Sequence, residues 1–184
     1  MKWDEEYLKE TLKTLDNDQI LSIMAIGEES ISKLKLQKII FLASKILKVD
    51  ISDNFEAYDY GMFDEALMEE VEDMPEIINK KKNLSLTDFG IAIYNKLLEL
   101  LDKRIIELFQ ILRSLDEDKL LEITYNLYPE YTENSKIKDK VIKEPSKIEV
   151  YNMLKFNQSL ININKKSKYI IKKLDDSIEI TKAE

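Results

Sequence analysis

The stretch from residue 55 to residue 74 constrains the fold of this chain most. It contains a glycine at position 61, and Pro75 follows its end directly. Glycine adopts tight-turn conformations that other residues avoid, and proline cannot continue a helix. The stretch therefore predicts an extended segment over residues 55–58, a tight turn at Gly61, and a short helix that Asp64 caps and Pro75 ends.

The segments on either side of this stretch extend the pattern. Before it, residues 33–48 predict an apolar helix that Ser30 or Ser32 caps, with lysines on its remaining faces. After it, residues 77–86 predict two short strands joined by a lysine-rich tip. This order is the plan of a winged helix, whose short helix normally enters DNA. The predicted fold class is mainly α: a winged helix-turn-helix with a small two-stranded β-wing, a long central helix and extra C-terminal helices.

The long central helix is predicted from residue 88 to about residue 114, with Thr87 as its cap. Apolar residues recur along it by three and four without a slip, as in the seam of a coiled coil. A core helix of a monomer and a two-chain interface both fit this pattern. We expect a homodimer, with an interface made of Ile91, Tyr94, Leu98, Leu101, Ile105, Leu108 and Leu112.

Three regions are expected along the chain. Residues 1–90 form the winged-helix domain with an N-terminal helix, residues 88–115 form the long and dimerising helix, and residues 116–184 form a helical extension. Within the extension, helices are predicted from Asp116 to Tyr128, over the lysine-rich residues after Ser135, from Pro145 onward and over residues 166–176.

The residue types present restrict the chemistry available to this chain. It has no cysteine and no histidine, and only three glycines. Thiolate metal sites, disulfides, the commonest general base and glycine-rich phosphate loops are therefore absent. We expect no enzyme activity, no cofactor and no metal. No apolar run approaches the ~20 residues that span a bilayer, so we expect a cytoplasmic protein without membrane contact.

Charge is strongly segregated along the sequence, beneath a net charge of −8. Residues 33–48 carry five lysines and no acid, whereas residues 49–79 carry eleven acids and no base. Residues 136–184 then carry twelve lysines against seven acids. Such blocks are ordinarily solvated faces, and they also suit separate acidic and basic surfaces for different partners.

Three short motifs resemble those of a known family. Its pattern is a helix with Lys-Leu-Gln-Lys, a Tyr-Gly-Pro-Phe-Ser turn, and a wing that closes on Leu-Thr-x-x-Gly. The matching segments here are residues 32–42, 58–64 and 86–90, and residues 125–135 resemble the region after the wing. The chain thus resembles archaeal winged-helix proteins related to the SocA-like antitoxin, or Panacea, domain over roughly residues 17–143.

Two positions depart from that pattern: Met62 replaces the usual proline and Asp64 replaces serine. Gly61 preserves the turn, and aspartate caps a helix as well as serine does. The resemblance implies a binding module without catalysis, which acts as an antitoxin-type partner of another protein or as a regulator.

The acidic short helix favours a protein partner over DNA. Six carboxylates on residues 64–73 would repel phosphates, whereas a basic or toxin-like protein would complement them. Aromatic residues beside the helix supply anchors of the kind that dominate binding energies, although the same residues also suit a core. The expected partner-binding residues are Tyr58, Tyr60, Phe63, Glu65, Glu69, Glu72 and Asp73.

The alternative is a DNA-binding transcriptional regulator that contacts DNA through lysines. Lysines on helix 33–48 and on the wing would neutralise phosphates on either side of the acidic helix. Arginine, the main reader of guanine, occurs only as Arg104 and Arg113 on the long helix. The expected DNA-binding residues are Lys33, Lys35, Lys38, Lys45, Lys80, Lys81 and Lys82.

Overall fold

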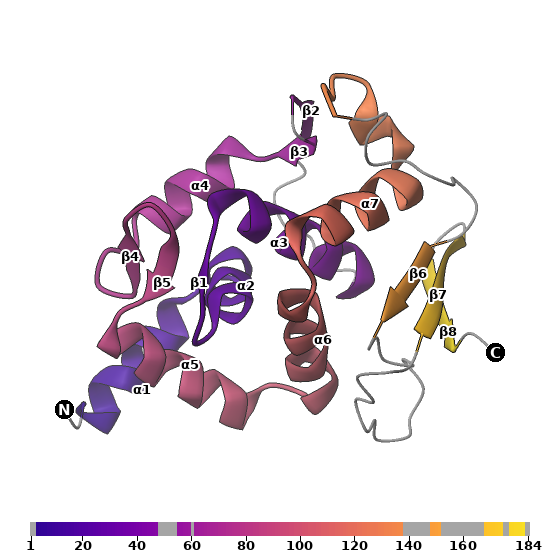
Figure 1. Cartoon of the computed structure of the whole chain (residues 1–184). Helices are drawn as coiled ribbons and strands as arrows, with labels where there is room; N and C mark the ends of the chain where they lie inside the picture. Colours follow the sequence, from indigo (N-terminus) through magenta and orange to yellow (C-terminus); the bar gives the residue numbers. More distant parts are fainter. Residues whose placement is uncertain are drawn as a thin grey trace.

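A computed structural model describes residues 3–47, 55–59 and 61–137, together with the backbone of three further strands between residues 148 and 182. The described chain is mainly helical (Figure 1). Its α-helices are α1 (Glu5–Thr14), α2 (Asn17–Ile26), α3 (Lys33–Leu47), α4 (Glu65–Glu72), α5 (Asp88–Leu100), α6 (Lys103–Ser114) and α7 (Glu117–Leu127), and a 3-10 turn, η1 (Pro129–Thr132), follows α7.

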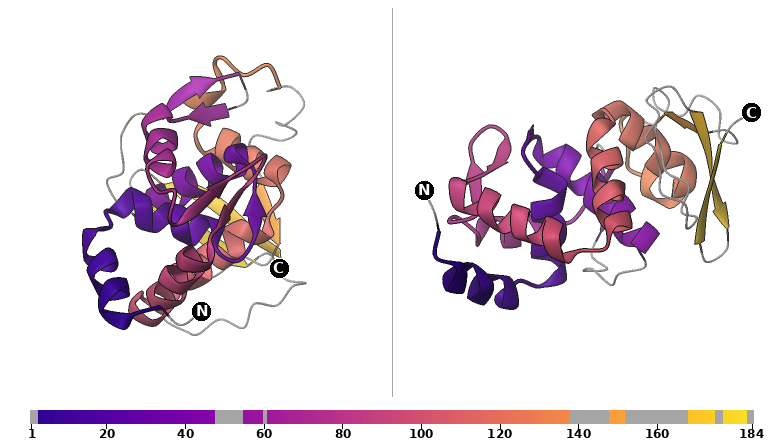
Figure 2. Two further views of the ribbon diagram at one scale, coloured as in Figure 1. Left: turned by 90° about the vertical axis from the view of Figure 1, so that its left-hand side faces the viewer. Right: turned by 90° about the horizontal axis from the view of Figure 1, so that it is seen from below.

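The strands form three small antiparallel sheets. In the first sheet, β5 (Leu84–Leu86) lies between β1 (Ser30–Ile31) and β4 (Ile78–Lys80). The second is a hairpin of β2 (Glu56–Tyr58) and β3 (Gly61–Phe63), which leads directly into α4. The third sheet contains β6 (Ile148–Tyr151), β7 (Lys168–Leu174) and β8 (Ser177–Lys182), and it lies beside α3 and α7 at the end of the molecule opposite α1 (Figures 1 and 2).

Helix α3 is the centre of the hydrophobic core. Residues 36–44 are all buried, because α2 packs on one side of α3 while α6 and α7 pack on another. In the middle of α3, the ring of Phe41 makes edge-on contacts with Phe55, Tyr128 and Tyr131, with ring centroids 4.9–5.2 Å apart. Such aromatic contacts stabilise the fold by more than the burial of their apolar area alone provides. They connect the helix to the start of the β2–β3 hairpin and to the end of α7.

The helix starts predicted at Asp64, Thr87 and Asp116 are confirmed, and of the two serines offered for α3, Ser32 is the cap. At each one a side-chain oxygen accepts a hydrogen bond from a backbone N–H of the first turn, which otherwise lacks a partner. Helix α2 also has a reciprocal bond between Gln19 and the backbone N–H of Asp16. The capping residues are Asp16 for α2, Ser32 for α3, Asp64 for α4, Thr87 for α5 and Asp116 for α7.

The prediction of one helix from residue 88 to residue 114 is wrong. Helix α5 ends at Leu100, and α6 starts at Lys103 in a different direction (Figure 1). Asp102 causes the break, because its carboxylate accepts from the backbone N–H of Arg104 at 2.8 Å and from the Arg104 guanidinium. A short polar side chain that bonds to nearby backbone favours a cap over a helix interior.

The break also removes the continuous seam expected for a dimer. Tyr94, Leu108 and Leu112 are buried in the core of their own chain. The other four residues, Ile91, Leu98, Leu101 and Ile105, are half-buried and pack against that core. These seven side chains therefore pack on the core of one chain rather than line a straight coiled coil, and the homodimer itself stays a prediction.

The prediction of C-terminal helices is partly wrong. Helix α7 is present, but residues 148–151 and 168–174 are strands where helices were predicted. Isoleucine, valine and tyrosine recur in these segments, and β-branched and aromatic residues favour strands over helices. The lysine-rich helix expected after Ser135 falls mostly outside the described residues.

The junction between the first sheet and α5 depends on a close backbone approach at Gly90. A Cβ atom at this position would lie 2.1 Å from the carbonyl oxygen of Ile77. Thr87 holds the same junction together: its hydroxyl accepts from Gly90 N at 2.9 Å and donates to the carbonyl of Glu76, while Thr87 N donates to Ile77 O. The Leu-Thr-x-x-Gly motif thus sets how closely α5 approaches the residues before β4.

We predict that Gly90→Ala lowers the free energy of unfolding by about 2 kcal/mol or more, since the new methyl group displaces backbone atoms. Urea denaturation followed by circular dichroism measures this change. Asn95→Ala, on the exposed side of the same helix, is the control and is expected to be neutral or slightly stabilising. A stabilising effect of Gly90→Ala, as helix propensity alone would give, contradicts the close approach.

Candidate protein-binding site

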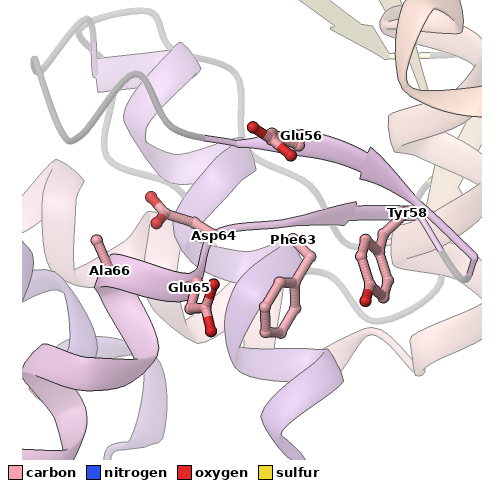
Figure 3. Close-up of a pocket in the computed structure, with 6 residues that line it drawn as sticks. All are labelled: Glu56, Tyr58, Phe63, Asp64, Glu65 and Ala66. Carbon is pink, nitrogen blue, oxygen red and sulfur yellow. The ribbon is translucent and has the colours of Figure 1, made fainter.

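Two aromatic side chains stand together on the β2–β3 hairpin. Tyr58 is 59% exposed, Phe63 is half-exposed, and their ring centroids are 5.6 Å apart (Figure 3). The register explains this placement, because Glu56 pairs with Phe63 and Tyr58 pairs with Gly61. Residues two apart on a strand share a face, so Glu56, Tyr58 and Phe63 project to the same side.

The hairpin is held rigidly against α7 and the residues that follow it. Gly61 has φ +109°, and a Cβ there would lie 2.9 Å from the Leu121 side chain, so only glycine fits the turn. On the outer edge of β2, the Asn134 amide donates to the Ala57 carbonyl at 2.9 Å. Lys136 N donates to the Asp59 carbonyl, also at 2.9 Å. These contacts fix the backbone that carries Tyr58.

A buried pair of hydrogen bonds sets the position of α4 relative to α3. The Gln37 side chain donates to the Asp64 carbonyl at 2.8 Å and accepts from Asp64 N at 3.1 Å. Both residues are fully buried. The Asp64 carboxylate in turn accepts from Leu67 N at 3.2 Å as the cap of α4. One glutamine side chain therefore fixes the point where the hairpin becomes a helix.

Two pockets share the Tyr58–Phe63 pair in their linings. One, of about 340 Å³, is lined by Glu56, Tyr58, Phe63, Asp64, Glu65 and Ala66 (Figure 3). The other, of about 280 Å³, is lined by Lys33, Leu34, Tyr58, Gly61, Met62 and Phe63. The first contains three carboxylates and no base, whereas the second is mainly apolar. The rings of Tyr58 and Phe63 line both pockets, and we call them the aromatic wall.

The acidic character continues along the outer face of α4. Glu65, Glu69 and Glu72 are all exposed and follow one another at a spacing of four and three residues, so they share a helix face. At the far end, Glu72 forms an ion pair with Lys33 at 3.4 Å, and its carbonyl accepts from the Lys80 ammonium. Among the described residues, Lys33 and Lys80 therefore border this acidic face at its far end.

The structure brings together some of the residues expected to bind a protein partner. Tyr58, Phe63 and Glu65 line one pocket, and Glu69 and Glu72 extend from it along α4. Asp73 lies apart, in a cleft between the end of α1 and residues 74–77. Tyr60 lies outside the described residues.

The lysines of α3 do not form the exposed basic surface that was expected to bind DNA. Lys38 was expected on a solvent face, but it is fully buried. Burial lowers its pKa to about 8, although the negative charge of Glu117 acts in the opposite direction and raises the pKa. The expectation for Lys38 is therefore wrong: α3 is covered on several sides at this level and has no solvent face there. Lys35 donates to the Arg113 carbonyl at 2.7 Å, and Lys45 lies over the Phe41 ring at 5.6 Å.

The β4–β5 hairpin keeps part of the basic surface expected of a wing. Lys81 and Lys82 at the tip between β4 and β5 are exposed. Lys80 is also exposed, but its ammonium donates to the Glu72 carbonyl at the end of α4. Of the seven lysines, these two at the tip are the best placed to contact a phosphate.

The sequence did not identify every residue that lines the site. The two pockets are also lined by Glu56, Leu34 and Met62, which are not among the partner-binding residues predicted from the sequence. Glu56 follows from the predicted strand over residues 55–58, because residues 56 and 58 share a face. Met62 and Leu34 required knowledge of β3 and of the packing between β3 and α3, which no local pattern reveals.

The inner side of α4 carries a carboxyl group in an unusual setting. Burial and the negative charges of Asp18, Asp16, Asp64 and Asp73 raise the pKa of Glu70 to about 7. Its Oε2 atom is buried without a hydrogen-bond partner among the described residues. Charging Glu70 therefore costs folding free energy.

Comparisons with profiles of protein families, with curated proteins and with solved structures find no match for this chain. Among the described residues, no group of three or more carboxylates is arranged to hold a metal ion. No described helix is long and apolar enough to cross a membrane. The geometry of the site itself is therefore the basis for a functional proposal.

We predict that Glu70→Gln stabilises the protein by about 1 kcal/mol at pH 8 and has no such effect at pH 4. The folded pKa exceeds the unfolded value, so the contribution of Glu70 is favourable at low pH and is lost as the pH rises toward 7. The side chain is partly exposed, so the full shift is discounted. Urea denaturation at both pH values measures the difference. Glu69→Gln, which changes the net charge equally from the exposed face, is the control; an equal gain there would refute the role of burial.

We also predict that Gln37→Leu lowers the free energy of unfolding by about 2–3 kcal/mol. It removes the hydrogen bonds that Gln37 makes to the buried N–H and C=O of Asp64, and buried polar groups that lose a hydrogen bond retain their desolvation cost. Gln110→Leu, on the exposed side of α6, is the matched control and is expected to be nearly neutral. Thermal denaturation distinguishes the two, and equal effects would contradict the role given to Gln37.

Proposed function

We propose that this chain is a non-enzymatic winged-helix regulator or adaptor of the antitoxin type, which acts by binding another protein through the Tyr58–Phe63 surface. The order α2, β1, α3, α4, β4 and β5, with β5 paired to both β1 and β4, supports a winged-helix arrangement. The family motifs also have structural roles here: Gln37 bonds to Asp64, Gly61 makes the turn, and Thr87 with Gly90 closes the wing.

The observation that carries the proposal is the exposed aromatic pair on a fixed backbone. Tyrosine is 59% exposed at position 58 although its hairpin is bonded on the outer edge and packed against α7. Aromatic anchors that are already ordered lose little conformational entropy on binding, and such residues dominate the energy of protein interfaces. The negative charges of Glu56 and Glu65 beside the pair favour a positively charged partner over a negatively charged one.

The DNA-binding alternative has weaker support. In a winged helix α4 would enter the groove, and its exposed face carries Glu65, Glu69 and Glu72. Among the α3 lysines, Lys33 pairs with Glu72 and Lys38 is buried. The exposed wing-tip lysines are the observation that favours it, so binding of random duplex DNA at low salt is measured beside the protein test.

We predict that Tyr58→Ser/Phe63→Ser strongly weakens binding of the partner. The tagged chain is produced in its native cells, proteins retained by the wild type and lost by the variant are identified, and each is purified and titrated. Loss of both aromatic anchors is expected to weaken the interaction by about thirtyfold or more.

Tyr7→Ser is the matched control, since Tyr7 is also exposed, at 49%, but lies on α1 away from the site. Both variants are first shown to unfold at the same urea concentration as the wild type. Equal partner binding by wild type and double variant would overturn the proposal. So would a salt-sensitive DNA shift that Lys81→Glu/Lys82→Glu abolishes.

A further inference from the structure

The two pockets beside the aromatic wall differ sharply in chemistry although they share the same two rings. The first presents carboxylates from Glu56 and Glu65, both exposed, and is lined by no basic side chain. The second presents the apolar side chains of Leu34 and Met62. A single short segment that crosses the wall would meet both environments within a few residues.

We propose that the site binds a segment of a partner protein in which an arginine and an aliphatic residue lie close together in sequence. The arginine enters the pocket between Glu56 and Glu65, and the aliphatic side chain enters the pocket beside Leu34 and Met62. This inference rests on the proposed function and specifies the chemistry of the partner.

Arginine fits the acidic pocket better than lysine does. A guanidinium is planar, so it can stack on an aromatic face while its edge donates to carboxylates, and a lysine ammonium lacks this geometry. Tyr58 and Phe63 supply the ring faces, and Glu56 and Glu65 supply the acceptors from β2 and from the first residue of α4. The third carboxylate, of Asp64, already accepts from Leu67 N as the helix cap.

The second pocket suits an aliphatic side chain of moderate size. Its volume of about 280 Å³ is bounded by Leu34 on α3 and by Gly61 and Met62 on β3. Methionine adapts its shape to different apolar groups. Lys33 lines the pocket as well, but its ammonium is directed to Glu72, so its stem rather than its charge borders the space.

The surrounding charge favours the same partner. Glu69 and Glu72 continue the negative face of α4 beyond Glu65, and residues 49–79 contain eleven acids and no base. Such a field raises the rate at which a positively charged segment arrives and rejects acidic ones. The aromatic wall and the two pockets then select among basic segments.

The experiment uses the full chain as bait for a phage-displayed library of random dodecapeptides. Enriched peptides are synthesised in acetylated and amidated form and titrated by fluorescence polarisation in 0.15 M salt. We expect arginine with an aliphatic residue within three positions of it. Glu56→Gln/Glu65→Gln is expected to weaken these peptides about tenfold or more, and arginine-to-lysine peptides are expected to bind several-fold more weakly. Glu28→Gln/Glu29→Gln, a pair of exposed acids elsewhere with the same charge change, is the control and leaves binding unchanged.

The other outcomes overturn the inference in distinguishable ways. Neutral or acidic peptides that require Tyr58 and Phe63 would refute the arginine assignment while the proposed function stands. A complete lack of peptides that depend on the two aromatic residues would count against both. A wild-type dimer in sedimentation that Glu56→Gln/Glu65→Gln dissociates would assign the surface to a second copy of this chain, whose exposed Arg104 would then be the occupant.

Discussion

The two hydrogen bonds between the Gln37 side chain and the backbone of Asp64 connect the core of this protein to its surface. Gln37 lies in the fully buried part of α3, and Asp64 is the residue at which β3 becomes α4. A buried amide that bonds to both backbone groups of one residue fixes position and direction together, because neither group has water as a substitute. This connection sets the position of α4 and its acidic residues. The packing of Gly61 against α7 and the hydrogen bonds from residues 134–136 also hold the hairpin that carries Tyr58 and Phe63.

The parts of the fold that depend on local chemistry could be predicted from the sequence. The caps at Asp64, Thr87 and Asp116 and the stop before Pro75 each involve residues a few positions apart. The break at Asp102 was missed because the apolar repeat continues across it, and the cap outweighs the repeat there. The burial of Lys38 was missed for a different reason: it depends on how α6 and α7 cover α3, which is a tertiary arrangement that periodicity on α3 alone does not contain.

The same distinction applies to the candidate site. Tyr58, Phe63 and Glu65 were selected from composition and position beside the acidic helix, and they do line one pocket. Asp73 was selected by the same reasoning and faces another cleft, since the C-terminal end of a two-turn helix points away from the hairpin. The division into an acidic and an apolar pocket came from the pairing of β2 with β3 and the packing of β3 on α3, so it required the structure.

The arrangement of charge explains why an acidic α4 does not oppose the fold. In sequence, the lysines of α3 and the wing look like a basic surface interrupted by an acidic helix. In space, Lys33 and Lys80 both reach Glu72 at the end of α4, and Lys35 bonds to the Arg113 carbonyl inside the fold. These lysines therefore serve internal contacts, while Glu56, Glu65 and Glu69 face outward beside an exposed aromatic pair. Such a combination complements a cationic, partly apolar segment better than a phosphate backbone, and this supports the proposed protein partner over DNA.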